Sequence, residues 1–261
     1  MDLFLSPRHN QSSAAIESAA KEVGWNVHRL TNWRVPESYH ASASGITAYG
    51  EPLFVAAIAD ALDLALIEPT FSWLSNLPAQ YLKRKVELTT LGEARRLNMK
   101  TFAKPADDKC FAAKVYESGA AIEASQLLPK TSPVILSDVV DWELECRYFV
   151  LERKVMCSSP YSFDGELIDD SFVESDNNVN ERSIFIESLL EDETVPLPPA
   201  CVVDIGLIRG KGWAVVEANP AFGAGIYQCE PARVLPVLAR SLVLRRDLSP
   251  SDHPWVLERT E

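Results

Sequence analysis

The chain has 261 residues, 47% of them hydrophobic, and its 25 basic and 37 acidic residues give a formal net charge of −12. This length is enough for one large domain or for two to three packed lobes. The negative charge argues against a protein that binds DNA or RNA by bulk electrostatics, because such binding needs basic side chains to neutralise phosphates. A local basic pocket for a small nucleotide is compatible with the same charge.

The five cysteines are scattered and form no Cys-x-x-Cys pair. This pattern favours a reduced, cytoplasmic protein over a disulfide framework or a zinc site. The first residues lack a basic segment ahead of a long apolar core, so we expect no secretory signal. The longest apolar run, residues 53–67, is interrupted by Asp60 and Asp63, so we expect no membrane span and no membrane partner.

Residues 1–75 are predicted to form one α/β lobe. Ser12 or Ser13 is a candidate helix cap and Gly24 a helix stop, with a short apolar strand on either side of this helix. This strand, helix, strand order implies a small parallel sheet. The predicted strands cover residues 3–6, 26–30, 46–49 and 65–67, and the second predicted helix covers residues 53–62.

Residues 76–140 and 141–261 are predicted to form two further lobes. Strand 142–151 alternates, with Glu143, Glu145 and Arg147 on one face, and residues 155–161 are expected to pair with it as a hairpin. The acidic stretch 164–180 has no helical or strand-like hydrophobic period and is predicted to be a loop. The other predicted strands cover residues 100–105, 111–116 and 133–137, and the predicted helices cover residues 90–97, 183–190 and 234–243 and a segment at Glu123 and Ala124.

Two apolar strands, residues 201–207 and 212–217, carry the oxygen-bearing side chains of a candidate metal site. Asp204 lies in the first strand, and Glu217 and Asn219 lie two residues apart at the end of the second. Residues at i and i+2 share a face of a strand, and antiparallel pairing would bring Asp204 close to them. Two carboxylates and an amide suit Mg²⁺. The alternative is a hairpin with charges at its ends.

Upstream residues supply matching positive charge. Lys104 ends a strand and Lys109 follows a short acidic loop, and lysines in such positions can meet phosphate oxygens. The pair Glu145 and Arg147 would be costly on an apolar strand unless that face lines a polar site. Each feature alone is also explained by surface lysines or by a solvent-facing strand. Together they predict a nucleoside triphosphate site, without the glycine loop of P-loop enzymes or of protein kinases.

In this order the motifs resemble ATP-grasp proteins, and most closely the clade of small ATP-grasp domains named for one arginine and two lysines. The resemblance covers roughly residues 75–245. It implies an α+β protein in which two α+β lobes hold ATP between them, preceded by the α/β lobe of residues 1–75. The matching motifs are Phe102-Ala103-Lys104-Pro105, Glu145-Cys146-Arg147-Tyr148-Phe149, Val203-Asp204-Ile205-Gly206 and Val216-Glu217-Ala218-Asn219-Pro220.

The resemblance also implies a role for each site residue. Lys104 would contact the α- and β-phosphates, with Lys109 preferred over Lys114 as the second lysine. Arg147, next to Glu145, would contact the γ-phosphate or an acyl phosphate. The Mg²⁺ ligands would be Asp204, Glu217 and Asn219. The hinge around adenine and ribose would be Ser137, Asp138, Val139, Val140 and Asp141. The usual glycine-rich flap over the phosphates is not evident, because residues 105–110 are short and acidic.

The activity implied by the resemblance is an ATP- and Mg²⁺-dependent carboxylate–amine ligase that works through an acyl phosphate and releases ADP and phosphate. Its partners would be ATP and an unidentified carboxylate and amine, either small molecules or peptides. One alternative is a regulatory module that binds nucleotide without catalysis. Another is a nucleotidyl-transfer ligase for nucleic-acid ends, which the net charge of −12 disfavours.

Overall fold

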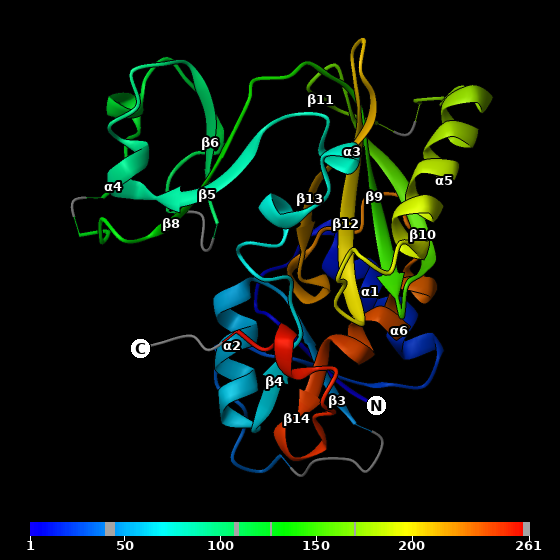
Figure 1. The fold of residues 1–261 in the computed structure, drawn as a ribbon. Helices are drawn as coiled ribbons and strands as arrows, with labels where there is room; N and C mark the ends of the chain where they lie inside the picture. The colour runs from blue at the N-terminus through cyan, green and yellow to red at the C-terminus, as the bar shows by residue number, and fades with distance from the viewer. Residues whose placement is uncertain (40–44, 107–109, 126, 170, 258–261) are drawn as a thin grey trace.

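The computed structural model describes residues 1–39, 45–106, 110–125, 127–169 and 171–257. It has the α+β composition predicted from the sequence, arranged as three sheet-containing lobes (Figure 1). No helix within the described ranges is both long and apolar enough to cross a membrane.

The first lobe is built on a parallel sheet of order β2-β1-β3, as the strand, helix, strand order predicts. The predicted cap of its first helix was wrong by a few residues: Asn10 is the cap. Its side-chain oxygen accepts the N–H of Ser13 at 2.8 Å, and Ser13 Oγ accepts the N–H of Asn10 at 3.1 Å. The elements are β1 (Asp2–Leu5), α1 (Gln11–Glu22), β2 (Asn26–Arg29), β3 (Ile46–Tyr49), α2 (Pro52–Ala61) and β4 (Leu64–Leu66).

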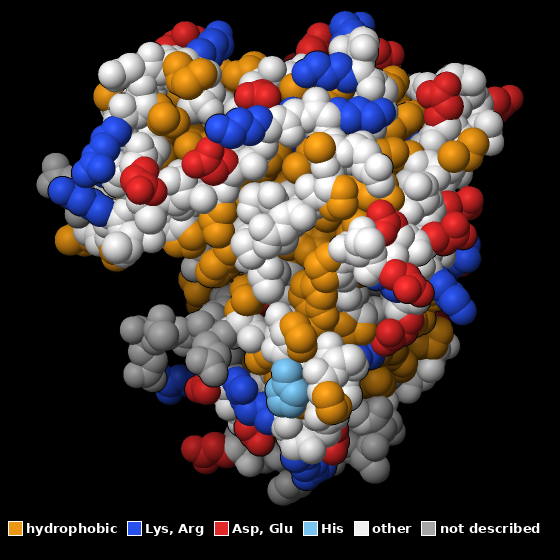
Figure 2. Space-filling model, viewed as in Figure 1, with side chains coloured by type: hydrophobic (Ala, Val, Ile, Leu, Met, Phe, Trp, Pro, Cys, Tyr) orange, Lys and Arg blue, Asp and Glu red, His pale blue; other side chains and the backbone are white. Residues whose placement is uncertain are grey.

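The second lobe is a four-stranded antiparallel sheet of order β5-β8-β6-β7. Its edge strand β5 was missed, and the helix predicted at Glu123 was wrong because only a 3₁₀ turn, Gly119–Ala121, lies there. In Figure 2 this lobe projects at the upper left, and the surface is hollowed beneath it. The elements are α3 (Ala79–Leu82), β5 (Val86–Thr90), α4 (Leu91–Ala94), β6 (Thr101–Pro105), β7 (Lys114–Tyr116) and β8 (Pro133–Ser137).

The third lobe is a five-stranded antiparallel sheet of order β11-β10-β9-β12-β13. The loop predicted over residues 164–180 was wrong in part, because it contains β11 and the start of α5, which Ser175 caps by accepting the N–H of Asn178 at 3.3 Å. The elements are β9 (Trp142–Leu151), β10 (Lys154–Phe163), β11 (Glu166–Leu167), α5 (Asp176–Glu191), β12 (Ala200–Ile208) and β13 (Gly212–Asn219). Two last elements, α6 (Pro231–Ser241) and β14 (Leu242–Leu244), follow them in the chain.

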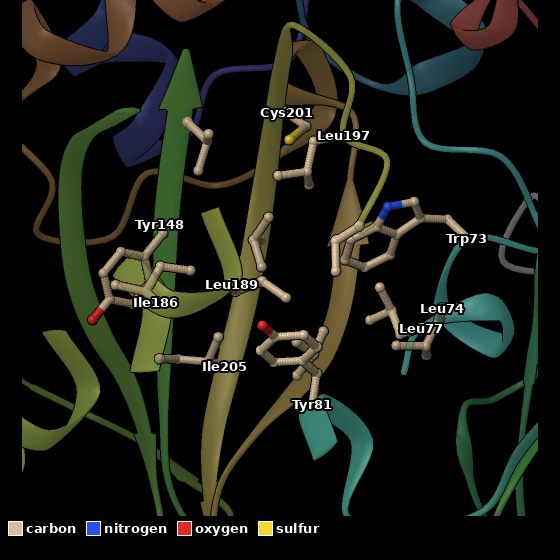
Figure 3. Packing of buried hydrophobic residues seen from close by; sticks show 14 of the residues in the cluster. Trp73, Leu74, Leu77, Tyr81, Tyr148, Ile186, Leu189, Leu197, Cys201 and Ile205 are labelled. Atoms are coloured by element: carbon tan, nitrogen blue, oxygen red, sulfur yellow. The ribbon is translucent and has the colours of Figure 1, made fainter. Parts of the chain in front are cut away.

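One face of this sheet is buried against α5 and the segment that joins the first two lobes. Trp73 anchors the joining segment, since its ring is 3% exposed and its Nε1 donates to the carbonyl of Pro196 at 2.6 Å. Figure 3 shows Trp73 and Tyr81 on one side of this core, with Ile186 and Leu189 from α5. The apolar residues of β9 and β12 that share this face therefore hold the third lobe together.

The opposite face of the sheet is shared between a core and a polar site. Phe149 and Val202 pack with α1 and α6 in a second core. The last elements of the chain return to the first lobe: the Thr47 hydroxyl donates to the carbonyl of Leu238 at 2.7 Å, and β14 pairs with β4. The half of this face nearer the second lobe carries Glu145, Arg147 and Glu217 instead of apolar residues.

Candidate nucleotide site

A row of charged side chains crosses three neighbouring strands of the third lobe. Arg147 on β9 lies opposite Asp204 on β12, and Asp204 lies opposite Glu217 on β13. The register between β12 and β13 shifts directly after this pair, so Val216 is an extra residue in β13. This bulge places Glu217 opposite Asp204 at the end of the hairpin, as the sequence predicts.

Arg147 and Asp204 form a buried bidentate ion pair. Nε donates to Oδ1 at 2.9 Å and Nη2 to Oδ2 at 2.7 Å, while Asp204 is wholly buried and Arg147 is 8% exposed. Burial alone would lower the pKa of the Arg147 guanidinium, but the charge and hydrogen bonds of Asp204 raise it above its ordinary value. Nη1 donates to the carbonyl of Gly225 at 3.0 Å, so each terminal nitrogen has a second N–H that these bonds do not use.

Glu217 joins the second lobe to the third. Its Oε2 forms an ion pair with Lys104 Nζ on β6, and its Oε1 accepts the amide N–H of Asn219 at 2.8 Å. Burial works against ionisation of Glu217, but Lys104, Asn219 and Arg147 outweigh it and lower the pKa of the carboxyl from 4.5 to about 2. The carboxylate therefore stays ionised through the physiological range, facing a lysine from the opposite lobe.

A cavity of about 310 Å³ lies where these two lobes meet. Lys104 and Lys114 reach it from β6 and β7, and Glu217 reaches it from β13. The predicted hinge forms another part of its wall, so the structure brings together predicted site residues from widely separated parts of the chain. The lining residues are Leu74, Arg84, Phe102, Lys104, Lys114, Val115, Ile135, Ser137, Asp138, Val139, Val140, Trp142, Val216 and Glu217.

Arg147, Asp204 and Asn219 are not among the described residues that line the cavity, and three further predicted residues also lie elsewhere. Asp141 is not among the described residues that line the cavity, and its carboxylate accepts from Arg209 Nε at 2.9 Å on the outer surface. Glu145 shares the sheet face of Arg147 and accepts the hydroxyl of Tyr161 at 2.9 Å, and burial raises the pKa of its carboxyl. Lys109 lies outside the described residues. A more open hollow of about 400 Å³ between β10 and the start of α6 holds none of the predicted site residues.

The chemistry of the donor set fits a Mg²⁺ ion. Asp204, Glu217 and Asn219 offer carboxylate and amide oxygens, which this ion prefers, and Glu217 lines the cavity. Both carboxylates are engaged by cations in this structure, Asp204 by Arg147 and Glu217 by Lys104. The described residues contain no group of three or more His, Cys, Asp or Glu side chains arranged to hold a metal ion.

Sequence reasoning missed four residues around the charged row. Tyr161 and Tyr227 stack on each other, with ring centroids 4.9 Å apart, and both lie near the Arg147 guanidinium, at 5.5 and 5.0 Å. Arg84 and Trp142 form a second stack, at 4.9 Å, in the cavity wall. In the sequence these aromatic and arginine residues look like ordinary strand or turn residues. Whether they lie near the site depends on how distant segments of the chain pack.

Comparison with known proteins identifies the family of this chain. The matching family model is family 2 of the ATP-grasp domains in the clade named for one arginine and two lysines, and it covers residues 81–237. No curated protein sequence gives a significant match.

Several solved structures share the fold at low sequence identity. D-cycloserine synthetase DcsG is 14% identical with a TM-score of 0.53, and 92% of this chain and 99% of that chain are covered. A RimK domain protein ATP-grasp from Sphaerobacter thermophilus is 13% identical with a TM-score of 0.50, over 92% and 98% of the two chains. N5-carboxyaminoimidazole synthetase from Staphylococcus aureus, complexed with ADP, is 9% identical with a TM-score of 0.50, over 92% and 77%.

Proposed function

Since this chain belongs to family 2 of the ATP-grasp clade named for one arginine and two lysines, we propose that it is an ATP- and Mg²⁺-dependent ligase. The bond it makes joins a carboxylate to an amine or a related nucleophile, with release of ADP and phosphate. Its other substrates are a carboxylate and an amine, either small molecules or peptides.

The observation that carries the proposal is the cavity between the second and third lobes, with Lys104 and Lys114 on one side and Glu217 on the other. Lysines act on phosphate groups as compact point charges, and the two lysines lie on paired strands of one sheet. Lys114 lies opposite Ala103, so its side chain leaves the other face of the sheet from Lys104, but β7 is the edge strand and Lys114 lines the cavity. We therefore propose Lys114 as the second phosphate lysine, in place of the Lys109 favoured by the sequence.

The third lobe contributes the groups that would act at the transferring phosphoryl group. Asp204 fixes the orientation of the Arg147 guanidinium. Each terminal nitrogen has an N–H that the bonds to Asp204 and Gly225 do not use, and it can be donated to phosphoryl or carboxyl oxygens. Its guanidinium is fixed before any ligand arrives, so little reorganisation is needed as charge develops. The buried carboxylate of Asp204 keeps it in that orientation.

Mg²⁺ would be held by Asp204, Glu217 and Asn219. When bound, the ion supplies charge that neutralises the β- and γ-phosphate oxygens. Glu217 and Lys104 form an ion pair across the cleft, and with nucleotide bound Lys104 would pair with phosphate oxygens while Glu217 would serve as an ion ligand. The chain's own residues thus bind, orient and shield the reacting groups, and the proposal assigns no general base.

The test is nucleotide binding followed by turnover. Mg²⁺–ATP should bind to the wild-type protein, and Lys104→Ala or Glu217→Ala should weaken binding by about tenfold or more, since each removes a charge-assisted contact. Lys100→Ala is the matched control, because Lys100 lies next to β6 and its ion pair among the described residues is with exposed Glu117.

Release of ADP should then rise when a suitable carboxylate and amine from a panel of amino acids and peptides are added together. Binding without any stimulated release across such a panel would favour a regulatory nucleotide module. A covalent lysine–AMP adduct would favour nucleotidyl transfer. Absence of ATP binding by the wild-type protein would refute the proposal.

A further inference from the structure

Arg84 connects the two lobes that enclose the cavity. It lies between α3 and β5, and its guanidinium has four acceptors. Nε donates to Ser137 Oγ at 3.1 Å, and Nη1 donates to the carbonyls of Leu82 at 3.1 Å and Val215 at 2.7 Å. Nη2 donates to the carbonyl of Val216 at 3.1 Å. One side chain thus contacts the end of β8 in the second lobe and the middle of β13 in the third.

The contacts on β13 lie at the bulge that positions Glu217. Val216 is the extra residue of the bulge, and it directly precedes Glu217. A bulge leaves backbone groups out of the strand ladder, and Arg84 supplies a donor to the carbonyl there. The position of Glu217 relative to Lys104 therefore depends in part on Arg84, which donates to the two backbone carbonyls directly before Glu217.

The contacts on β8 lie at the predicted hinge. Ser137 Oγ accepts from Arg84 and donates to the carbonyl of Asp138 at 2.9 Å. The neighbouring residue continues the connection, since the N–H of Asp138 donates to the carbonyl of Lys85 at 3.0 Å and the N–H of Lys85 donates to Asp138 Oδ2 at 2.9 Å. Residues 84 and 85 together fix the backbone of the hinge.

Arg84 also lines the cavity itself. Its guanidinium lies over the Trp142 ring at 4.9 Å, and this ring packs so closely on β12 that a Cβ on Gly206 would lie 2.5 Å from it. Burial lowers the pKa of Arg84 to about 10, and Asp138 and Glu145 oppose that effect, so the side chain stays charged at neutral pH. Burying a cation in a cavity wall costs free energy unless the cation is paired or hydrogen-bonded, as Arg84 is here.

We propose that Arg84 is a positioning residue that sets the shape of the nucleotide pocket and its preference for adenine over guanine. The inference rests on the proposed function, in which the hinge meets the base; the N–H and carbonyl of Asp138 bond within the protein, so the base would face the next hinge residues, Val139 and Val140, which also line the cavity. Adenine and guanine differ in their donors and acceptors along one edge, so a fixed hinge backbone can distinguish them while a mobile one cannot. Arginine suits this role because its planar fork reaches several acceptors at once, whereas lysine presents a compact point charge.

The experiment measures dissociation constants for Mg²⁺–ATP and Mg²⁺–GTP with the wild-type protein and with Arg84→Met and Arg84→Lys. Loss of two or more interlobe hydrogen bonds should weaken ATP binding by about tenfold or more. The ratio of the GTP constant to the ATP constant should fall towards one in both variants, since lysine restores the charge without the fork. Lys104→Ala, in contrast, should weaken ATP and GTP alike.

Arg153→Met is the matched control. Arg153 donates to three backbone carbonyls, of Leu190 at 2.7 Å, Asp192 at 2.6 Å and Val195 at 3.0 Å, all within the third lobe and away from the cavity. The Arg153→Met substitution should lower thermal stability but leave the ratio of the GTP constant to the ATP constant unchanged. If Arg84→Met fails to fold, Ser137→Ala removes the single acceptor at the hinge and should lower the ratio in the same direction by a smaller factor.

The outcomes separate the two proposals. A wild-type protein that prefers ATP, with an unchanged ratio in folded Arg84 or Ser137 variants, would overturn the inference alone. An equal fall of the ratio in Arg153→Met would also overturn it, because general destabilisation would then explain the effect. A wild-type protein that binds neither nucleotide would refute the proposed function, and this inference with it.

Discussion

Lys104→Met should destabilise the protein in a pH-dependent way, because it leaves the Glu217 carboxylate without its cation. The two side chains are 19% and 28% exposed, and Lys104 is the largest influence that favours ionised Glu217. Methionine keeps most of the lysine stem, so packing changes little while the charge is removed.

The magnitude follows from the pKa of Glu217, which the folded protein lowers from 4.5 to about 2. At about 1.36 kcal/mol per pKa unit this corresponds to roughly 3 kcal/mol. That figure is an upper limit, because Asn219 and Arg147 also contribute and because solvent reaches the pair. We expect a loss of about 2 kcal/mol in the free energy of unfolding at pH 7.

The sign of the pH dependence is fixed by the direction of the shift. A carboxyl whose pKa is lowered by folding stabilises the protein above its unfolded pKa, and that contribution is lost as pH falls from 4.5 to about 2. The difference between wild type and Lys104→Met should therefore be largest near neutral pH and should shrink through this window. Urea unfolding at pH 7, 5 and 3 measures it.

Lys100→Met provides the control, since the Lys100 pair with Glu117 has side chains 55% and 81% exposed and its loss should change stability by less than about 0.5 kcal/mol. A Lys104→Met effect that is equal at pH 7 and pH 3 would refute the reasoning, because it would then come from packing. A direct carboxyl titration by NMR should also show a higher pKa for Glu217 in the variant.

Three further predictions concern the same site. Asp204→Ala should cost about 3–5 kcal/mol in urea unfolding, because it leaves the buried Arg147 charge unpaired, and the Asp204→Leu, Arg147→Met double variant should recover part of that loss. Gly206→Ala should destabilise the protein by about 1–3 kcal/mol and alter tryptophan fluorescence, since its Cβ would displace Trp142, and an unchanged spectrum would contradict this. Lys114→Ala should weaken ATP binding about tenfold while changing stability by less than about 0.5 kcal/mol, and equal affinities would show that this lysine does not contact phosphate.

Strands with unambiguous apolar patterns were predicted to the residue. β3, β8 and β9 have the predicted bounds, because runs such as Pro133–Ser137 leave the backbone few alternatives. The same local signal failed for β5, whose threonines and Glu87 are half-buried or exposed at a sheet edge. It also failed for the start of α5, where Ser175 and an acidic first turn lie within a segment that has little apolar period.

The amino-acid order was sufficient to predict candidate phosphate-binding and metal-binding groups. They follow one another on four strands, and they are Lys104, Arg147, Asp204, Glu217 and Asn219. It was not sufficient to indicate how these groups pair. Those pairings depend on strand order in the third lobe and on contact between lobes, neither of which is encoded in local periodicity.

The hydrogen bonds of Arg84 to β8 and β13 could not be predicted from the sequence, because both strands are distant from Arg84 along the chain. Its partners are mainly backbone carbonyls, at Leu82, Val215 and Val216. Every residue has a carbonyl, so no side-chain pattern marks the acceptors in advance. Folding decides which carbonyls are left by a bulge or a strand end for an arginine to bind.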